Sequence, residues 1–523
     1  MSRFGSRLAF AVVLITGISY FAAAQVNVTT YHNDIARSGV NSQESVLSPH
    51  TVKSKFKKLF SQPVDGAIYG QPLYLSGVNL PDGKGTHNIV YVATEHDSVY
   101  AFDADSSSAN NAAPLWQASF INPAANITAV PSSVINCFNI APEVGITSTP
   151  VIDPATGTLY VVAKSSENGT IVQRLHALDV TTGGEKFGGP VAIQASVLNP
   201  AGRTIAFNAA QQNQRAGLLL LNGAVYIAWG SHCDHQPYYG WVMAYSASTL
   251  QQLGVWNAAP GSGKGGIWMG GAGLASDGTF VYLVTGDGKF NADIGGVNHG
   301  EAIIKLGAPT SGTLPVLDYF APYNGAALSS TNSDFGSAGI ILLPNQPSTA
   351  PYTHLAAVAS KSGTLYLVNR DNLGGFNSSG DEIVQELPSV MEPSFGAPAF
   401  WKNTFYCGSR GVLRAFSFDS TTGLFSTSPT SQTALRFQYA PPSPSVSADA
   451  NSGGIVWVVQ TNNFTTGGPA ILHAYNANNL QNQLYVSEGA DVPGPAVVFS
   501  VPTIANGKVY VGTANQLSVY GLR

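Results

Sequence analysis

The sequence has little charge, few cysteines and only one long apolar run. Asp, Glu, Lys and Arg make up 10% of its 523 residues, whereas they make up about 25% of a typical soluble protein. Acidic residues outnumber basic ones by 29 to 24, so we expect no nucleic-acid partner. No C-x-x-C-H stretch, G-x-S-x-G elbow or D-x-D-x-D-G loop is present. Covalent haem attachment, an α/β-hydrolase nucleophile and an EF-hand are therefore excluded.

The one long apolar run stands at the beginning of the chain. Arg3 and Arg7 precede the apolar residues 8–21, and three alanines follow before Gln25. This order is typical of a secretory signal peptide, so residues 1–24 are predicted to be a leader cleaved after Ala24. A membrane anchor would need about 20 apolar residues, so we expect no membrane insertion. The protein is predicted to be secreted or periplasmic.

Eight similar units follow one another along the rest of the chain. Each has a strand rich in small residues, a turn, a strand such as VYVAT, a loop, and a third strand such as SVYAFD. Short β-branched and aromatic runs between turn residues are typical of strands. A fourth strand, such as LWQASF at 115–120, fits between units. The units begin at Tyr69, Ile146, Arg215, Gly270, Gly336, Phe395, Ser445 and Ser500.

This repeat predicts an all-β fold, an eight-bladed β-propeller of four-stranded antiparallel blades. The eighth unit ends after three strands, so we expect FKKLFSQPV at 56–64 to supply the fourth and close the ring. The propeller is then one domain of residues 56–523, preceded by an N-terminal extension at 25–55. We expect a monomer.

In such a propeller, the loops between second and third strands open on one face, together with the connections between blades. Polar groups on loops held by a rigid scaffold favour a ligand site there. Arg215 begins an inner strand, and its guanidinium needs either an anionic ligand or an internal acid such as Glu143 or Asp234. The predicted ligand-binding residues are His96, Asp97, Arg215, His232, Asp234, His235, Asp287, Lys361 and Arg410.

The loop GSHCDHQPYYG at 230–240 suggests a metal, but its spacing is poor for zinc. Neighbours in an extended chain point to opposite sides, so at most His232 and Asp234 could face one ion. Calcium ligation by Asp287, Glu301 or Asp97 remains open, and no metal site is assigned.

The three cysteines leave at least one thiol unpaired within the chain. Cys137 lies in the connection between the first two blades and opens on the same face as Cys233. We therefore expect a Cys137–Cys233 disulfide. Cys407 lies within a strand and is expected to be a buried thiol.

The repeats resemble those of quinoproteins, eight-bladed dehydrogenases that use pyrroloquinoline quinone (PQQ). The family repeat A-x-D-x-x-T-G-x-x-x-W matches ALDVTTGGEKF at 177–187, with Phe in place of Trp, and more loosely 101–116, 244–256 and 415–425. TYHNDIARSGVNSQESVLSPHTV at 30–52 is similar to the segment before the first blade of those enzymes. The sequence looks closest to a secreted group of PQQ-like repeat proteins.

The resemblance implies PQQ and calcium as cofactors of an alcohol or sugar dehydrogenase. Asp97, Asp234 or Asp287 would then act as base, and Arg215 or Lys361 would hold the quinone. The sequence departs from the family, because it has no adjacent cysteine pair and no matching Glu, Asn and Asp set for the metal.

We therefore predict a secreted propeller that binds a glycan or another polar small molecule at its loop-rich face, without redox chemistry. Tyr238, Tyr239 and Trp241 could stack on a sugar, although Trp241 also has the strand period expected of packing between blades. The PQQ- and calcium-dependent dehydrogenase and a structural or assembly scaffold are the alternatives.

Overall fold

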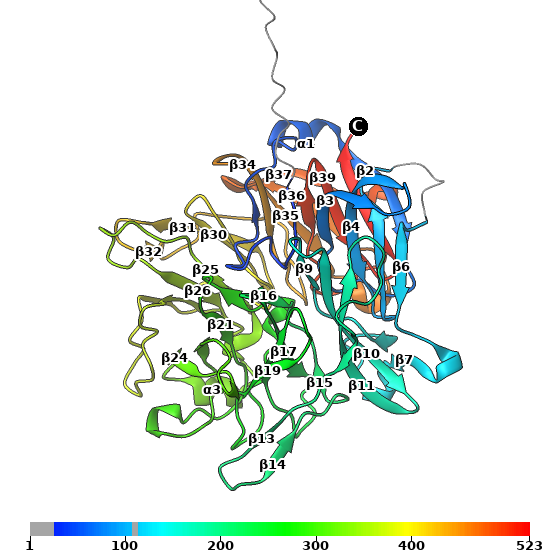
Figure 1. Ribbon diagram of the computed structural model, residues 1–523. Helices are drawn as coiled ribbons and strands as arrows, with labels where there is room; N and C mark the ends of the chain where they lie inside the picture. Colours follow the sequence, from blue (N-terminus) through cyan, green and yellow to red (C-terminus); the bar gives the residue numbers. More distant parts are fainter. Residues whose placement is uncertain (1–25, 107–112) are drawn as a thin grey trace, which may run out of the picture.

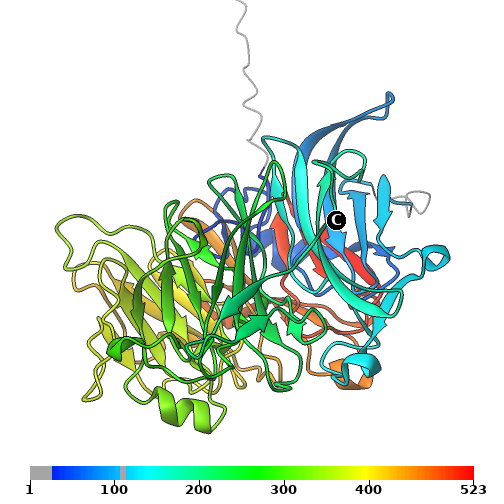
Figure 2. The same ribbon diagram turned by 60° about the horizontal axis from the view of Figure 1, so that its bottom comes forward.

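The computed structural model describes residues 26–106 and 113–523. The predicted leader at 1–24 lies outside the described residues. Eight antiparallel blades, each built on four strands and some extended by short additional strands, follow the chain around a ring, so the predicted eight-bladed propeller is confirmed (Figure 1 and Figure 2). Among the described residues, no helix is long and apolar enough to cross a membrane.

Each blade runs outward from an inner strand beside the central channel. The strands of the first four blades, from inside to outside, are β3 (Leu73–Leu80), β4 (Gly85–Ala93), β5 (Ser98–Asp103), β6 (Trp116–Ser119); β9 (Val151–Asp153), β10 (Thr158–Glu167), β11 (Thr170–Asp179), β12 (Val191–Ala192); β16 (Leu219–Leu221), β17 (Ala224–Ser231), β18 (Trp241–Ser246), β19 (Gln252–Asn257); and β20 (Ala275–Ser276), β21 (Val281–Val284), β22 (Ile303–Leu306), β24 (Val316–Phe320). Those of the last four are β25 (Ile340–Leu342), β26 (Leu355–Ala359), β27 (Leu365–Asn369), β28 (Gln385–Leu387); β29 (Ala399–Trp401), β30 (Thr404–Gly408), β31 (Leu413–Asp419), β32 (Leu424–Phe425); β34 (Ser445–Asp449), β35 (Ser452–Gln460), β36 (Ile471–Asn476), β37 (Asn479–Val486); and β38 (Thr503–Ala505), β39 (Lys508–Gly512), β40 (Gln516–Leu522), β2 (Phe56–Pro63).

The remaining elements are short additions to this ring. They are β1 (Val40–Asn41), β7 (Ile127–Pro131), β8 (Glu143–Val144), β13 (Ser196–Leu198), β14 (Thr204–Ala206), β15 (Gln212–Asn213), β23 (Gly312–Thr313), β33 (Ser431–Gln432), and the helices α1 (Pro49–Lys55), α2 (Ser132–Ile135) and α3 (Gly325–Ser330).

Strand β2 closes the ring, as predicted. It pairs antiparallel with β40 from Phe56 opposite Leu522 to Pro63 opposite Gln516. In Figure 1 the blue β2 lies beside the red strands of the C-terminal blade. An eighth blade of three strands would leave an unpaired edge, and this pairing removes it.

The apolar core lies between the faces of neighbouring blades. Leu73 and Ile89 of the first blade, for example, belong to one buried cluster with Leu159 and Val161 of the second. Trp116 at the end of the first blade also docks on the second, where its indole N–H donates to the carbonyl of Val180 at 2.9 Å. Stacking of this kind buries apolar surface on both faces of every blade.

The segment at 26–44 closes the channel from within. Its main chain exchanges hydrogen bonds with inner-strand residues of six blades, and Arg37 and Asn41 reach the other two by their side chains. The main-chain partners are Tyr74, Ile152, Ser276, Leu342, Phe400 and Val446. Because these contacts reach the inner strands themselves, the segment lies deeper than the connections that precede those strands.

Candidate functional site

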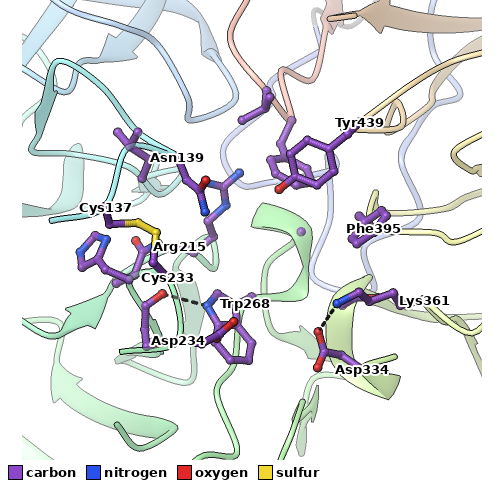
Figure 3. A pocket seen from close by; sticks show the side chains of 18 of the residues that line it. Cys137, Asn139, Arg215, Cys233, Asp234, Trp268, Asp334, Lys361, Phe395 and Tyr439 are labelled. Carbon is purple, nitrogen blue, oxygen red and sulfur yellow. Dashed lines mark hydrogen bonds and ion pairs between the residues drawn. A yellow bond between two sulfur atoms is a disulfide. The ribbon is translucent and has the colours of Figure 1, made fainter. Parts of the chain in front are cut away.

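A cavity of about 340 Å³ opens at the mouth of the channel, and we call it the mouth pocket (Figure 3). Its lining comes from connections that precede inner strands, as with Arg215 and Phe499, and from loops between second and third strands, as with Asp234 and Lys361. The volume lies within the range of about 300–1,000 Å³ found for small-molecule sites.

Arg215 is a buried cation in this pocket that forms no ion pair among the described residues, although the charge of the buried Glu95 acts on it. It is 8% exposed, and its guanidinium lies 4.3 Å from the centre of the Phe499 ring and 5.7 Å from that of Tyr69. The suggested ion pair with Glu143 or Asp234 is wrong: among the described residues no carboxylate forms an ion pair with Arg215, and Glu143 pairs with His96 instead. Burial lowers the pKa of Arg215, yet a guanidinium stays protonated near neutrality.

Flat aromatic surfaces complete the lining of the mouth pocket. Trp268, Phe395, Tyr439 and Phe499 line the pocket. The Trp268 indole donates to the carbonyl of Ser231 at 3.0 Å. A Cβ added to Gly266 would approach the ring to 2.4 Å, so the glycine backbone makes room for one face of the indole.

Three acids gather beside the pocket, and we call them the carboxylate cluster. Oxygen atoms of Asp287, Glu301 and Asp334 all lie within 4.8 Å of one another. Asp334 also lines the mouth pocket, where the Lys361 ammonium donates to it at 3.0 Å. The sequence predicted Asp287 and Glu301 as possible calcium ligands, but their third partner is Asp334 rather than Asp97.

The acids of the cluster suppress one another's ionisation, as does their burial. Burial and the neighbouring acids raise the pKa of Glu301 to about 9 and that of Asp287 to about 7. Asp287 Oδ1 and Glu301 Oε1 are buried and make no hydrogen bond, and the buried hydroxyl of Tyr238 is likewise unpartnered. Buried oxygen atoms without donors are suited to a hard cation such as Ca²⁺.

A second buried network lies behind His232. The Lys164 ammonium is enclosed and contacts His232 Nε2 at 2.6 Å and the carbonyl of Gln212 at 2.9 Å. Burial lowers the pKa of Lys164 to about 7 and that of His232 to about 2. His232 is therefore neutral and lines the mouth pocket as a hydrogen-bonding group without charge.

The predicted site residues fall into two groups. Arg215, His232, Asp234, Lys361 and Arg410 line the mouth pocket. The other four do not: His96 pairs with Glu143 at 2.9 Å, Asp97 is buried and accepts from the backbone N–H of Lys164 at 3.2 Å, the backbone N–H of His235 donates to the carbonyl of His232 at 3.2 Å, and Asp287 lies in the carboxylate cluster.

The predicted disulfide is confirmed, and it borders the mouth pocket. Cys137 and Cys233 are bonded with their Cα atoms 5.7 Å apart, and both line the cavity. Cys407 is the buried free thiol that the sequence predicted. The suggested exposed sugar platform of three aromatics does not form, because Tyr238 and Trp241 are 1% and 0% exposed and pack in the interior, while Tyr239 is half-buried.

No protein-family model matches the chain, and no curated protein is similar to it in sequence. Solved structures resemble its fold. The quinohemoprotein alcohol dehydrogenase of Comamonas testosteroni has a TM-score of 0.61 at 14% identity, covering 95% of this chain and 81% of that one. A europium-containing methanol dehydrogenase has a TM-score of 0.61 at 12% identity, covering 95% and 98%. The chain therefore has the eight-bladed PQQ-like propeller fold of quinoprotein dehydrogenases.

Proposed function

We propose that the protein is an exported propeller that binds an anionic small molecule in the mouth pocket. The single observation that carries this proposal is Arg215, a buried guanidinium that forms no ion pair among the described residues and has Glu95 as the only carboxylate whose charge acts on it. An unpaired buried cation is costly unless a ligand supplies the missing negative charge. The Cys137–Cys233 disulfide fits an oxidising compartment, which supports export.

The lining also indicates the shape of this ligand. Arg410 adds a second cation, and Trp268 and Tyr439 offer flat surfaces. A carboxylated ring, either aromatic or a sugar acid, would match both the charge and the flat surfaces. We further propose that the carboxylate cluster holds a hard cation, since three neighbouring carboxyl groups, two of them with an unpartnered buried oxygen, supply the oxygen ligands that Ca²⁺ prefers.

A PQQ-dependent alcohol or sugar dehydrogenase is the second candidate function. The observation that favours it is that Asp334 belongs to both the cluster and the mouth pocket, so a cation and a ligand would be neighbours. The residues fit the cofactor, because PQQ is a planar tricarboxylate: Arg215 and Arg410 would hold carboxylates and Trp268 would stack on the ring. PQQ supplies the hydride-accepting quinone when bound, and Asp334 would take the proton of the alcohol.

The test is calorimetric titration of the mature protein with PQQ and with D-glucuronate, each with and without Ca²⁺. We expect at least one probe to bind, and Arg215→Met to weaken it about tenfold or more, since a charge-assisted hydrogen bond contributes about 1.5–3 kcal/mol. The control is Arg203→Met on the exposed β13–β14 hairpin, which should leave the affinity unchanged.

The outcomes separate the functions. Binding without reduction of a dye by added alcohol supports a binding protein, whereas binding with reduction supports the dehydrogenase. If neither probe binds, the ligand proposal is wrong and the scaffold alternative gains support.

A further inference from the structure

Two lysines approach the carboxylate cluster from opposite sides. Lys361 donates to Asp334 at 3.0 Å and lines the mouth pocket. The Lys264 ammonium lies 3.7 Å from Asp287 Oδ2 and lines a second cavity of about 530 Å³, which we call the side pocket. Glu301 also lines the side pocket, so the cluster forms the wall between the two cavities.

The two lysines pair with two of the three acids in the cluster. They pair with Asp334 and Asp287, but Glu301 has no basic partner within ion-pair distance among the described residues. Its Oε1 and Asp287 Oδ1 are left without donors, and the enclosed hydroxyl of Tyr238 beside them is also unpartnered. Burial raises the pKa of Glu301 to about 9, so this carboxyl is protonated near neutrality, and a bound cation would replace its proton as well as the two ammonium groups.

Both lysines are able to move away. Their side chains are 22% and 32% exposed, and each opens into a cavity rather than into packed protein. A lysine is a hydrated point charge on a flexible stem, so it exchanges one partner for another with little rearrangement. A divalent cation at the cluster would repel both ammonium groups and contact all three acids.

We propose that Lys264 and Lys361 are internal counter-ions that compete with a bound cation at the carboxylate cluster. When the cation binds, each ammonium group turns into its own pocket and attracts an anion there. This makes the side pocket a second anion site and couples cation and anion binding, since coupling between sites is reciprocal. The inference rests on the cation site of the proposed function.

The first experiment measures Ca²⁺ affinity of the intact mature protein by calorimetry. Removing a competitor should tighten binding, so we expect Lys264→Met and Lys361→Met each to lower the Kd about three- to tenfold, the worth of a partly buried ion pair. Lys289→Met is the matched control: it also lines the side pocket, but among the described residues it pairs with no acid, so the Kd should not change.

A second experiment uses sulfate as the anion probe. Sulfate should tighten Ca²⁺ binding to the wild type but not to the Lys264→Met/Lys361→Met double variant. If wild type binds Ca²⁺ but the lysine variants bind it equally or more weakly, the counter-ion inference alone is wrong. If wild type and Asp287→Asn both fail to bind Ca²⁺, the proposed cation site and the inference fail together.

Discussion

Arg37 directs its buried guanidinium to main-chain carbonyls instead of to a carboxylate. It donates to the carbonyls of Leu274 and Tyr31 at 2.8 Å and of Leu218 at 3.3 Å, and to the Thr30 hydroxyl at 2.7 Å. Five N–H groups in a planar fork suit such a cluster of acceptors, which a lysine could not satisfy. Burial lowers the pKa of Arg37 to about 10, so the side chain stays charged at neutral pH.

Arg37→Met should therefore reduce the free energy of unfolding by about 2–4 kcal/mol, because several buried carbonyls lose their donors. Urea unfolding followed by tryptophan fluorescence would measure the loss. Arg37→Lys should recover less than half of it, whereas full recovery by lysine would show that charge rather than the fork matters.

The contribution of Glu392 to the stability of the fold depends on pH. Burial would raise its pKa, but hydrogen bonds and charge from Arg414 and Arg436 lower it to about 2, against an ordinary value of 4.5. The folded pKa lies below the unfolded one, so the ionised carboxylate stabilises the fold above about pH 4.5, and this stabilisation disappears as the pH falls towards 2.

We expect Glu392→Gln to cost about 1–2 kcal/mol at pH 7, after allowance for solvent screening, and close to nothing near pH 2. Denaturant unfolding at pH 7, 5 and 3 would follow this convergence. The exposed Glu488→Gln serves as the control, and a cost for Glu392→Gln that is independent of pH would contradict the assignment.

The sequence predicted some residues of the candidate site and missed others. Arg215 and Lys361 were predicted because the repeat register assigns them to the channel mouth. Asp334 and Trp268 were missed, since they lie in connections before inner strands and carry no recognisable motif. Asp97 was predicted from its loop, but it has a φ of 54° and its carboxylate turns inward to the backbone of Lys164.

At the scale of elements, the second blade differs most from expectation. The polar stretch KSSENGT at 164–170 predicts a loop, yet β10 and β11 continue to a two-residue turn at Asn168 and Gly169, both with positive φ. Ala129 of β7 pairs with Ser165 and satisfies the extended backbone. Pairing with β7 stabilises this polar stretch as a strand despite its polar sequence. A local sequence pattern cannot predict pairing with a segment that lies elsewhere in the chain.

The Cys137–Cys233 disulfide joins two loops that are 96 residues apart in the sequence, and its removal tests how much it stabilises them. Cys233→Ser should lower the free energy of unfolding by about 2–4 kcal/mol, because the crosslink restricts the unfolded chain. It should also raise hydrogen exchange at 132–140 and 231–237, on both sides of the mouth pocket. Reducing agent should reproduce both effects in the wild type and have none in the variant; an unchanged wild type would contradict this role.

At the scale of the whole molecule, the repeat predicted the number of blades and the closing strand. The same order of strands and turns recurs in every unit because similar units stack on one another, so the ring could be predicted from the sequence although the loops differ in length. The segment at 26–44 closes the channel, and we call it the plug; its position could not be predicted from the sequence. It contacts every blade through main-chain atoms and two side chains rather than through a repeated pattern.

A chain that begins at Val64 should not form a stable monomer. It lacks both the fourth strand of the last blade and the plug, so β40 is left as an open edge that pairs with other molecules. Size-exclusion chromatography with light scattering would detect the aggregates. A chain that begins at Gln25 is the control, and a monomeric truncated chain would show that the ring closes without β2.

The plug also sets the order of events as the protein folds. Val26 bonds to Asn506, 480 positions away, and Arg523 bonds to Leu59. Val26 and Leu59 therefore complete these two contacts only after the residues near the C-terminus have been made. Such distant pairings slow folding, because a long loop must close before any contact compensates for its entropy. Until these contacts form, the protein is an open ring of blades with unpaired edges at both ends. The longer this open state lasts, the more the protein depends on chaperones to prevent aggregation.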